Sequence, residues 1–450
     1  MVEMAPLRGL HYNLTKVPDL KQVVTPPYDV ISPTQQSLFY EQHPYNMVRL
    51  ILPRQQPGDS TEENRYIRAA RDFTSWQQNG ILSRDPQPAF YYWETTFEYQ
   101  GRRLTRGGVV GLVRLEPFES GMVRPHEKTF SATKNDRFQL MQHCRAHFSP
   151  IFALYSDATD RVLTTLRAGL PATPLFDFED LDGFRQRFYR VTEPQLLRDT
   201  AKLMADLTLY IADGHHRYET ALAYQAWLRP QFPQASPRAS FNYVLMYLSN
   251  LLDDNLVILP AHRLVDTLRL TRFEESELLT RLPEYFDLQP FTAAIGEPSS
   301  DGPKFTAALA EAEQTGAVLG LAAPGSRLWL LRLKPGIMNG PLAAQVPPAL
   351  AKLDVMALNY LIFEKIMGLS RQEQDDEETF KYASTAAEAL GAVACGRAGL
   401  AFLLNPTRIE QVQEVAAAGL IMPRKSTYFY PKILAGLVMH PINPQEEVGL

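Results

Sequence analysis

The sequence predicts an α+β protein of 450 residues. Apolar runs at helical spacing alternate along the chain with short runs rich in β-branched and aromatic residues, and no internal repeat is evident. Hydrophobic residues make up 45% of the chain and charged residues 21%, as in ordinary globular domains. Because the segments do not follow a regular βαβ order, the sequence favours mixed sheets over a doubly wound parallel sheet.

The first part of the chain contains the clearest local patterns. A helix is predicted at residues 62–79, where Tyr66, Phe73 and Trp76 recur at helical spacing. Strands are predicted at 89–99 and 102–115, joined by a Gln100-Gly101 turn. The further elements expected here are a helix at 136–147, a strand at 151–155, a helix at 193–207, a strand at 209–211, a turn at 212–216, a helix at 218–228 and a hairpin of strands 241–248 and 256–259.

Residues 295–303 (IGEPSSDGP) are the best linker candidate by composition. They divide the chain into two predicted portions, residues 1–295 and residues 304–450. The elements expected in the second portion are a helix at 305–314, strands at 318–321 and 328–333, a helix at 355–367, an exposed acidic loop at 373–378, a helix at 384–394, a strand at 400–404 and a helix at 409–418.

Charge and composition exclude several classes of protein. The 45 Lys+Arg and 50 Asp+Glu residues give a net charge of -5, which excludes a strongly basic nucleic-acid coat. Two cysteines, Cys144 and Cys395, are few for this length and fit a reducing compartment. No segment reads as a signal peptide or reaches the roughly 18 uninterrupted apolar residues of a membrane span. We expect a cytoplasmic protein without nucleic-acid or membrane partners; a homo-oligomer is compatible with the sequence.

The densest polar cluster is Asp213-Gly214-His215-His216-Arg217, between an apolar strand and a helix. Gly214 permits a tight turn, and the N–H groups at the start of the helix attract anions. Arg217 adds a fork of donors that matches phosphate oxygens. The cluster therefore predicts a phosphate or anion pocket, although the standard glycine-rich phosphate loops are absent from the sequence. The alternative is an Asp213 that caps the helix beside surface histidines.

A second cluster, RPHEKT at residues 124–129, combines cations with a carboxylate and an imidazole. Arg124 and Lys128 would bind phosphate groups, and Glu127 or His126 would accept the proton of an acceptor hydroxyl group. The alternative is an exposed loop of ordinary charges.

A third cluster at residues 422–432 interleaves aromatic side chains with polar and cationic ones that would bind a nucleotide. An edge strand with a basic outer face is the alternative. Asp29, next to two prolines, is either a presented carboxylate or a plain turn residue. The nucleotide-binding candidates of the third cluster are Arg424, Lys425, Ser426 and Lys432.

Six segments together resemble the family known as the domain of unknown function 1015. The DGHHR turn also resembles the phosphate-binding turn of the ParB/sulfiredoxin superfamily, which includes free-serine kinases, nucleotide-hydrolysing partition proteins and sulfiredoxins. The catalytic Cys of sulfiredoxin is replaced by histidine here, and no helix-turn-helix of the partition proteins is identified. The six segments, spread over nearly the whole chain, are PPYDVIS, NMVRL, RPHEKT, IADGHHRYETAL, LPAHRL and MPRKSTYFYPK.

The resemblance implies a ParB/sulfiredoxin-like N-terminal portion that carries the DGHHR turn, followed by a second mixed α+β portion with the basic-aromatic segment. It further implies that the five residues of the turn contact nucleotide phosphates or serve catalysis. Asp213 would hold Mg²⁺ or position the acceptor, while His215, His216 and Arg217 would hold phosphates.

The leading functional prediction is a nucleotide-dependent phosphotransferase acting on a small hydroxylated metabolite, with a free amino acid such as serine as the candidate acceptor. ATP or ADP, together with Mg²⁺, are the expected cofactors. The alternatives are a nucleotide hydrolase and a regulator that binds a nucleotide or phosphometabolite without turnover. An acidic residue beside phosphate favours catalysis, because a carboxylate repels phosphate unless a metal ion or an acceptor hydroxyl lies between them.

Overall fold

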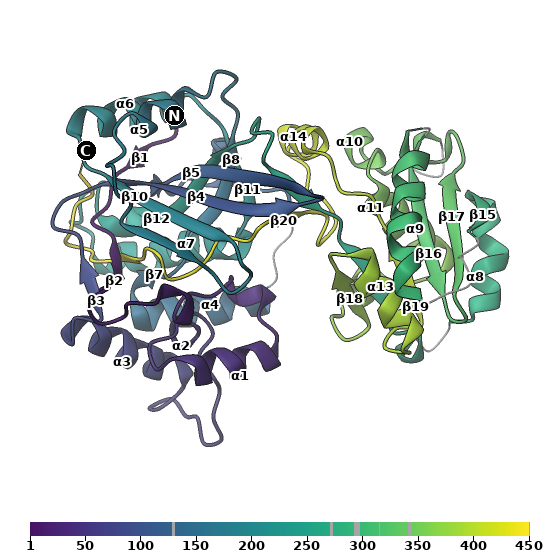
Figure 1. Cartoon of the computed structure of the whole chain (residues 1–450), viewed down its shortest axis with the longest axis horizontal. Helices are drawn as coiled ribbons and strands as arrows, with labels where there is room; N and C mark the ends of the chain where they lie inside the picture. Colours follow the sequence, from purple (N-terminus) through teal and green to yellow (C-terminus); the bar gives the residue numbers. More distant parts are fainter. Residues whose placement is uncertain (128–130, 271–272, 292–297, 315, 341–343, 450) are drawn as a thin grey trace. The chain divides into compact units, whose positions relative to one another are not determined.

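A computed structural model of the chain describes residues 1–127, 131–270, 273–291, 298–314, 316–340 and 344–449. It contains two compact units. Each combines helices with a sheet, which confirms the predicted α+β class (Figure 1). The division into residues 1–295 and 304–450, which the sequence analysis expects, stays a prediction. Unit 1 comprises Met1–Pro125, Thr129–Leu256 and Pro431–Leu450, and unit 2 comprises His126–Lys128 and Val257–Tyr430.

Among the described residues, unit 1 contains a nine-stranded mixed sheet. Its strands lie in the order β6-β11-β8-β12-β5-β4-β10-β9, and β1 pairs with β5. Most neighbours are antiparallel, but β11 runs parallel to β6 and β12 runs parallel to β8. The strands are β1 Met4–Ala5, β4 Phe90–Tyr99, β5 Arg102–Arg114, β6 Val123–Arg124, β8 Ile151–Tyr155, β9 Phe176–Glu179, β10 Arg185–Val191, β11 Leu209–Asp213 and β12 Tyr243–Asn250.

The helices of unit 1 pack on one another and on this sheet. Helix α4 packs on both α3 and α7, and α5 packs on α6 (Figure 1). Two small strand pairs, β2 with β3 and β7 with β21, complete the unit. The remaining elements are α1 Pro33–Gln42, α2 Val48–Ile51, α3 Arg65–Gln78, α4 Ser131–Cys144, α5 Arg161–Arg167, α6 Pro194–Ala205, α7 His215–Leu228, β2 Leu10–Tyr12, β3 Leu82–Arg84, β7 Ala146–His147, β21 His440–Pro441, and the single turns η1 Leu20–Gln22, η2 Tyr28–Val30, η3 Phe118–Ser120, η4 Arg229–Gln231 and η5 Ser240–Asn242.

Unit 2 contains, in its described residues, a six-stranded antiparallel sheet in the order β15-β17-β16-β19-β14-β18. A separate pair joins β13 to β20. Its elements are β13 Val257–Leu259, β14 His262–Val265, β15 Phe286–Phe291, β16 Val318–Ala323, β17 Arg327–Leu333, β18 Phe380–Ala383, β19 Leu400–Leu403, β20 Tyr428–Tyr430, α8 Glu275–Arg281, α9 Pro298–Glu313, α10 Pro348–Ala351, α11 Asp354–Ala357, the π-helix η10 Leu358–Ile366, α12 Arg371–Gln374, α13 Ala386–Ala394, α14 Ile409–Ala417, and the turns η6 Thr267–Arg269, η7 Leu282–Glu284 and η8 Ile337–Asn339.

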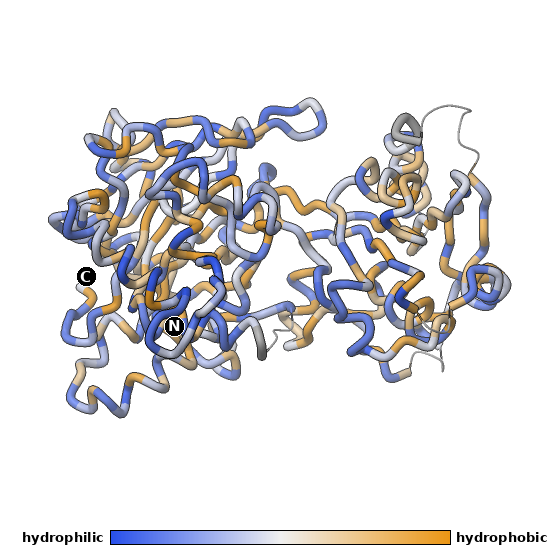
Figure 2. Tube along the Cα trace, turned by 90° about the horizontal axis from the view of Figure 1, so that it is seen from below, coloured by the Kyte–Doolittle hydropathy of each residue, from blue (hydrophilic) through white to orange (hydrophobic). Residues whose placement is uncertain are grey.

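The cores follow the two-residue period of the strands. In β19, Leu400 and Phe402 belong to one buried cluster of unit 2, whereas Ala401 and Leu403 belong to another. The sheet of unit 2 therefore carries a core on each face. Apolar segments run through the interior of both units in Figure 2, as the burial of these clusters requires.

Most local elements are confirmed, and four are corrected. The predicted 241–248/256–259 hairpin is wrong: both edges of β12 are occupied by β5 and β8, and β13 pairs with β20 in unit 2. The helix predicted at 136–147 begins earlier and ends at Cys144, because Arg145 adopts a φ of 50°.

The other two corrections concern helix starts. Helix α7 begins at His215 rather than at residue 218, so the histidines belong to its first turn. Residues 298–303 of the predicted linker are helical, because α9 extends from the buried Phe305 and Leu309 back to Pro298. Residues 295–297 lie outside the described part of the chain.

Candidate functional site

The DGHHR turn lies at the junction of β11 and α7, as the sequence predicts. Leu209 and Ile211 anchor the strand in the core of unit 1, and Asp213 is its last residue. Gly214 adopts a φ of 95°, which is unfavourable for any residue with a Cβ atom. A Cβ atom there would lie 2.8 Å from Nη2 of Arg217. Glycine is thus required both by the backbone and by the approach of the guanidinium group.

Asp213 lies between two cations. Its Oδ2 accepts a hydrogen bond from Nη2 of Arg217 at 2.7 Å, and its Oδ1 accepts one from Nζ of Lys432 at 2.5 Å. The three side chains are 10%, 14% and 12% exposed, so water screens these ion pairs little. The N-cap residue of α7 is Gly214. The structure therefore unites Lys432, from the third cluster, with the DGHHR turn.

Arg217 also fixes the loop that leads into β8. Its Nη1 donates to Oγ of Ser149 at 3.0 Å and to the carbonyl oxygen of Pro150 at 2.6 Å. Its Nε has no hydrogen-bond acceptor among the described residues. Arg217 thereby holds the first turn of α7 to the loop before β8. Its Nε–H group remains as a donor for a further acceptor.

A cavity of about 60 Å³ adjoins Arg217. Tyr28, from the PPYDVIS segment, lines it, and the Arg137 guanidinium lies over the Tyr28 ring at 4.1 Å. Burial raises the pKa of Tyr28, and the carboxylate of Asp29 adds to the rise. The PPYDVIS segment and the DGHHR turn therefore meet in unit 1, with Asp29 itself exposed. The cavity has room for several water molecules or a small chemical group. Its lining is Tyr28, Ile51, Arg137, Leu140, Met141, Ala146, His147, Phe148, Ser149, Ile151, Arg217 and Thr220.

The remaining residues of the turn and its surroundings are placed on neighbouring elements. His215 is buried and His216 is half-buried in the first turn of α7. Arg124 lies on β6 opposite Tyr210 of β11, where its Nε donates to the carbonyl oxygen of Gly121 at 3.1 Å. Glu219, one turn further along α7, accepts from Nζ of Lys134 at 2.6 Å. Arg124 and Pro125 of the RPHEKT cluster belong to unit 1.

His126 and Glu127 of that cluster belong to unit 2, and Lys128 and Thr129 lie outside the described residues. His126 is fully buried, and its Nε2 lies 2.9 Å from Oγ1 of Thr427. The same hydroxyl group lies 3.5 Å from Oε1 of Glu127. Their roles as proton acceptors stay predictions.

Arg424, Lys425 and Ser426 also belong to unit 2. Buried Arg263 donates to the carbonyl oxygens of Arg424 at 2.8 Å and Lys425 at 3.0 Å. Arg424 pairs with Glu377, and Ser426 Oγ donates to the carbonyl oxygen of Pro423 at 2.5 Å. This segment is therefore organised by unit 2, and its nucleotide-binding role stays a prediction.

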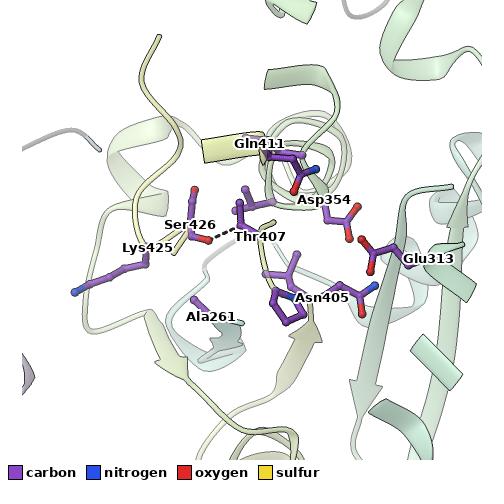
Figure 3. A pocket seen from close by; sticks show the side chains of 12 residues that line it. Ala261, Glu313, Asp354, Asn405, Thr407, Gln411, Lys425 and Ser426 are labelled. Carbon is purple, nitrogen blue, oxygen red and sulfur yellow. Dashed lines mark hydrogen bonds between the residues drawn. The ribbon is translucent and has the colours of Figure 1, made fainter. Parts of the chain in front are cut away.

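A small pocket of about 20 Å³ in unit 2 includes Lys425 and Ser426 in its lining. The carboxyl groups of Glu313 and Asp354 point toward each other across it (Figure 3). Burial, with the neighbouring Glu313, raises the pKa of Asp354 to about 7. The protonated form of Asp354 is therefore favoured in the folded protein.

Asp354→Asn is expected to stabilise unit 2 at pH 8. Because the pKa is raised in the folded state, the contribution of Asp354 to stability is full below its unfolded pKa of about 4 and is lost as the pH rises through 7. The expected gain is on the order of 2–4 kcal/mol at pH 8 and disappears below pH 4. Urea unfolding across this range measures it, with exposed Glu311→Gln on α9, the helix that carries Glu313, as the control. Parallel pH profiles for Asp354→Asn and the native protein would contradict the prediction.

Two buried histidines lie beside the cavity of unit 1. The rings of His147 and His440 stack at 6.0 Å. Burial lowers the pKa of His147 to about 4 and that of His440 well below its ordinary value. Both imidazoles are therefore neutral in the folded protein at physiological pH.

Unit 1 should consequently lose stability as the pH falls from 6.5 toward 4, because unfolding lets these imidazoles bind protons. His440→Phe removes one of them, so its stability relative to the native protein should improve by about 1–2 kcal/mol between pH 8 and pH 5. Urea unfolding at both pH values tests this, with exposed His143→Gln as the control. If the difference in unfolding free energy between His440→Phe and the native protein is the same at pH 8 and pH 5, protonation of His440 on unfolding is not the cause.

The sequence analysis missed Arg106, a buried arginine on β5. Its Nη1 donates to the carbonyl oxygen of Pro431 at 2.8 Å, directly before Lys432. The signal that could have found it is an arginine inside an apolar strand, followed by two glycines. Gly108 is needed there, because a Cβ atom would lie 2.4 Å from Cζ of Tyr247.

No group of three or more His, Cys, Asp or Glu side chains suited to a metal ion occurs in the described part of the chain. Asp213 supplies the carboxylate of the turn, and its two oxygens accept hydrogen bonds from Arg217 and Lys432. None of the described helices combines the length and the apolar character that crossing a bilayer requires.

Solved structures with a similar chain path include a free serine kinase variant in complex with AMP, at 12% identity and a TM-score of 0.36, over 75% of this chain and 93% of that one. A free serine kinase variant in complex with ADP matches at 10% identity with a TM-score of 0.36, over 75% of this chain and 92% of that one. C-terminally truncated SbnI from Staphylococcus aureus matches at 9% identity with a TM-score of 0.33, over 74% of this chain and 87% of that one. No curated protein matches the chain.

The model of one protein family matches residues 4–356, which is most of the chain. The match includes the PPYDVIS, RPHEKT, DGHHR and LPAHRL segments on which the sequence resemblance was founded. The chain therefore belongs to the family described as protein of unknown function DUF1015.

Proposed function

We propose that this protein is a nucleotide-dependent phosphotransferase that acts on the hydroxyl group of a small metabolite, with a free amino acid such as serine as the candidate acceptor. The observation that carries the proposal is Asp213, a carboxylate held between Arg217 and Lys432 at the start of a 14-residue helix. The resemblance of the DGHHR turn to that of free-serine kinases supports the same reaction.

The turn provides the two kinds of group that phosphoryl transfer needs. Backbone N–H groups at the start of α7, with Arg217 and Lys432, would bind the phosphate oxygens. Asp213 would position the acceptor hydroxyl group, and a carboxylate or imidazole would take its proton. Asp213 is also the residue that would hold Mg²⁺, which would neutralise phosphate charge.

In this reaction, the acceptor oxygen forms a bond to the terminal phosphorus atom of the nucleotide, and the bond from that phosphorus atom to the leaving phosphate oxygen breaks. The leaving nucleotide keeps the electron pair, and the proton of the acceptor goes to the base. A site that only bound phosphate would gain from Arg217 and Lys432 but would be weakened by Asp213, because like charges repel. The carboxylate therefore favours catalysis over simple binding.

A turnover screen tests the proposal. Purified protein is incubated with Mg²⁺ and ATP, ADP or CTP, and with amino acids or sugars, and phosphorylated products are detected by mass spectrometry. A phosphorylated small molecule whose formation needs both substrates supports the proposal. Release of phosphate without an acceptor would indicate a hydrolase, and tight nucleotide binding without any product would indicate a regulator.

A further inference from the structure

Arg106 is fully buried, yet no carboxylate pairs with it among the described residues. Its Nη1 is bound to the carbonyl oxygen of Pro431. Its Nε and Nη2 are buried and have no hydrogen-bond acceptor in the described part of the chain. A buried cation without a compensating anion is costly, so buried arginines are normally paired.

Aromatic rings contact the guanidinium group, and the Tyr247 hydroxyl group interacts with it electrostatically without reaching hydrogen-bond geometry. Its Cζ lies 4.9 Å from the centre of the Phe152 ring and 5.7 Å from that of Tyr247. These contacts offset part of the cost of burial. They leave the Nε–Nη2 edge, which carries two parallel N–H donors, without an oxygen in hydrogen-bond geometry among the described residues.

Strand register places this edge near the DGHHR turn. Asp213 lies opposite Phe152, and Phe152 lies opposite Tyr247, so their side chains share one face of the sheet. The Arg106 guanidinium lies over two of these three residues. On the other side, Pro431 joins it to Lys432, which binds Asp213. Arg217 and Lys432 therefore both pair with Asp213, whereas Arg106, which is joined to them through Pro431, pairs with no carboxylate among the described residues.

We propose that the Nε–Nη2 edge of Arg106 binds an oxyanion through two parallel hydrogen bonds. A carboxylate and a phosphate both present two oxygens at the spacing that this edge matches. The ligand is thus a phosphate group of the nucleotide or the carboxylate of an amino-acid acceptor. Assigning the oxyanion to a substrate rests on the proposed function, whereas oxyanion binding itself does not.

Arg106→Met tests the inference, because methionine keeps an unbranched side chain and removes the charge. The ligand-free variant should melt at the same temperature as the native protein or higher, since an uncompensated buried cation is gone. Its affinity for the bound oxyanion should fall at least tenfold in calorimetric titrations with inorganic phosphate, ADP and L-serine. Arg106→Lys, which keeps the charge but lacks the parallel donors, should also weaken binding. Exposed Arg103→Met on the same strand is the control.

The three titrations separate the sources of the oxyanion. Weaker binding of phosphate and ADP assigns Arg106 to the nucleotide, and weaker binding of serine alone assigns it to the acceptor. The inference is overturned if all three affinities are unchanged, or if the native protein binds none of the probes. If no turnover is found but Arg106→Met still weakens phosphate binding, the proposed function fails and this inference stands.

Discussion

Asp213→Asn should lower phosphotransfer turnover on the order of 10²-fold or more while the nucleotide still binds. The substitution keeps the shape of the side chain and removes the charge that would position the acceptor and hold Mg²⁺. Nucleotide affinity should persist, because Arg217 and Lys432 lose their carboxylate partner and become available to phosphate oxygens. Steady-state kinetics with a calorimetric measurement of nucleotide binding would show both effects.

Stability must be separated from chemistry in this test, because Asp213 compensates two partly buried cations. Asp85→Asn is the matched control: Asp85 is a buried carboxylate of unit 1 that pairs with Arg190 and His11. It should cost stability and leave turnover of the folded fraction unchanged. Glu127→Gln tests the second candidate carboxylate. Full turnover in both Asp213→Asn and Glu127→Gln would end the catalytic interpretation and leave only binding.

Gly214→Ala should destabilise unit 1 by about 2–4 kcal/mol and weaken anion binding at the turn. Two costs add. A residue with a Cβ atom is strained at a φ of 95°, and that Cβ atom would lie 2.8 Å from the Arg217 guanidinium. A shift of Arg217 that relieves the contact would strain its hydrogen bonds to Asp213, Ser149 and Pro150.

Gly183→Ala isolates the first cost, the backbone strain. Gly183 adopts a φ of 79°, and nothing lies within 4 Å of the position that the added methyl group would occupy. It should therefore show the backbone strain alone, about 1–2 kcal/mol in urea unfolding. The difference between the two variants measures the contact with Arg217. Equal losses of stability would mean that the guanidinium group adapts freely.

The elements that the sequence predicted well are those specified by neighbouring residues. The helix at 62–79 and the hairpin at 89–115 depend on local spacing and on a two-residue turn, where Gln100 and Gly101 both have positive φ values. The hairpin predicted after residue 241 fails for the opposite reason. The partners of β12 are β5 and β8, which are far from it in sequence and whose choice no local pattern encodes.

The candidate site likewise combines a segment that neighbouring residues specify with contacts between residues far apart in the sequence. The DGHHR turn is a continuous segment with its own chemistry, so its place between β11 and α7 could be predicted. No local pattern indicates the pairing of Asp213 with Lys432, which lie 219 positions apart in the sequence. Arg106 carries a local signal, an arginine inside an apolar strand, but the alternation of a strand does not indicate whether a buried arginine finds a carboxylate.

That separation of 219 residues also affects the order in which the protein is made. On the ribosome, Asp213 and Arg217 emerge long before Lys432, and the chain of unit 2 is synthesised in between. Unit 1 can close its site only when residues 431–450 return and pair β21 with β7. Such a late, long-range closure is entropically costly and slow compared with local folding. A nascent chain would thus carry Asp213 and Arg217 without Lys432 until the chain of unit 2 has been made.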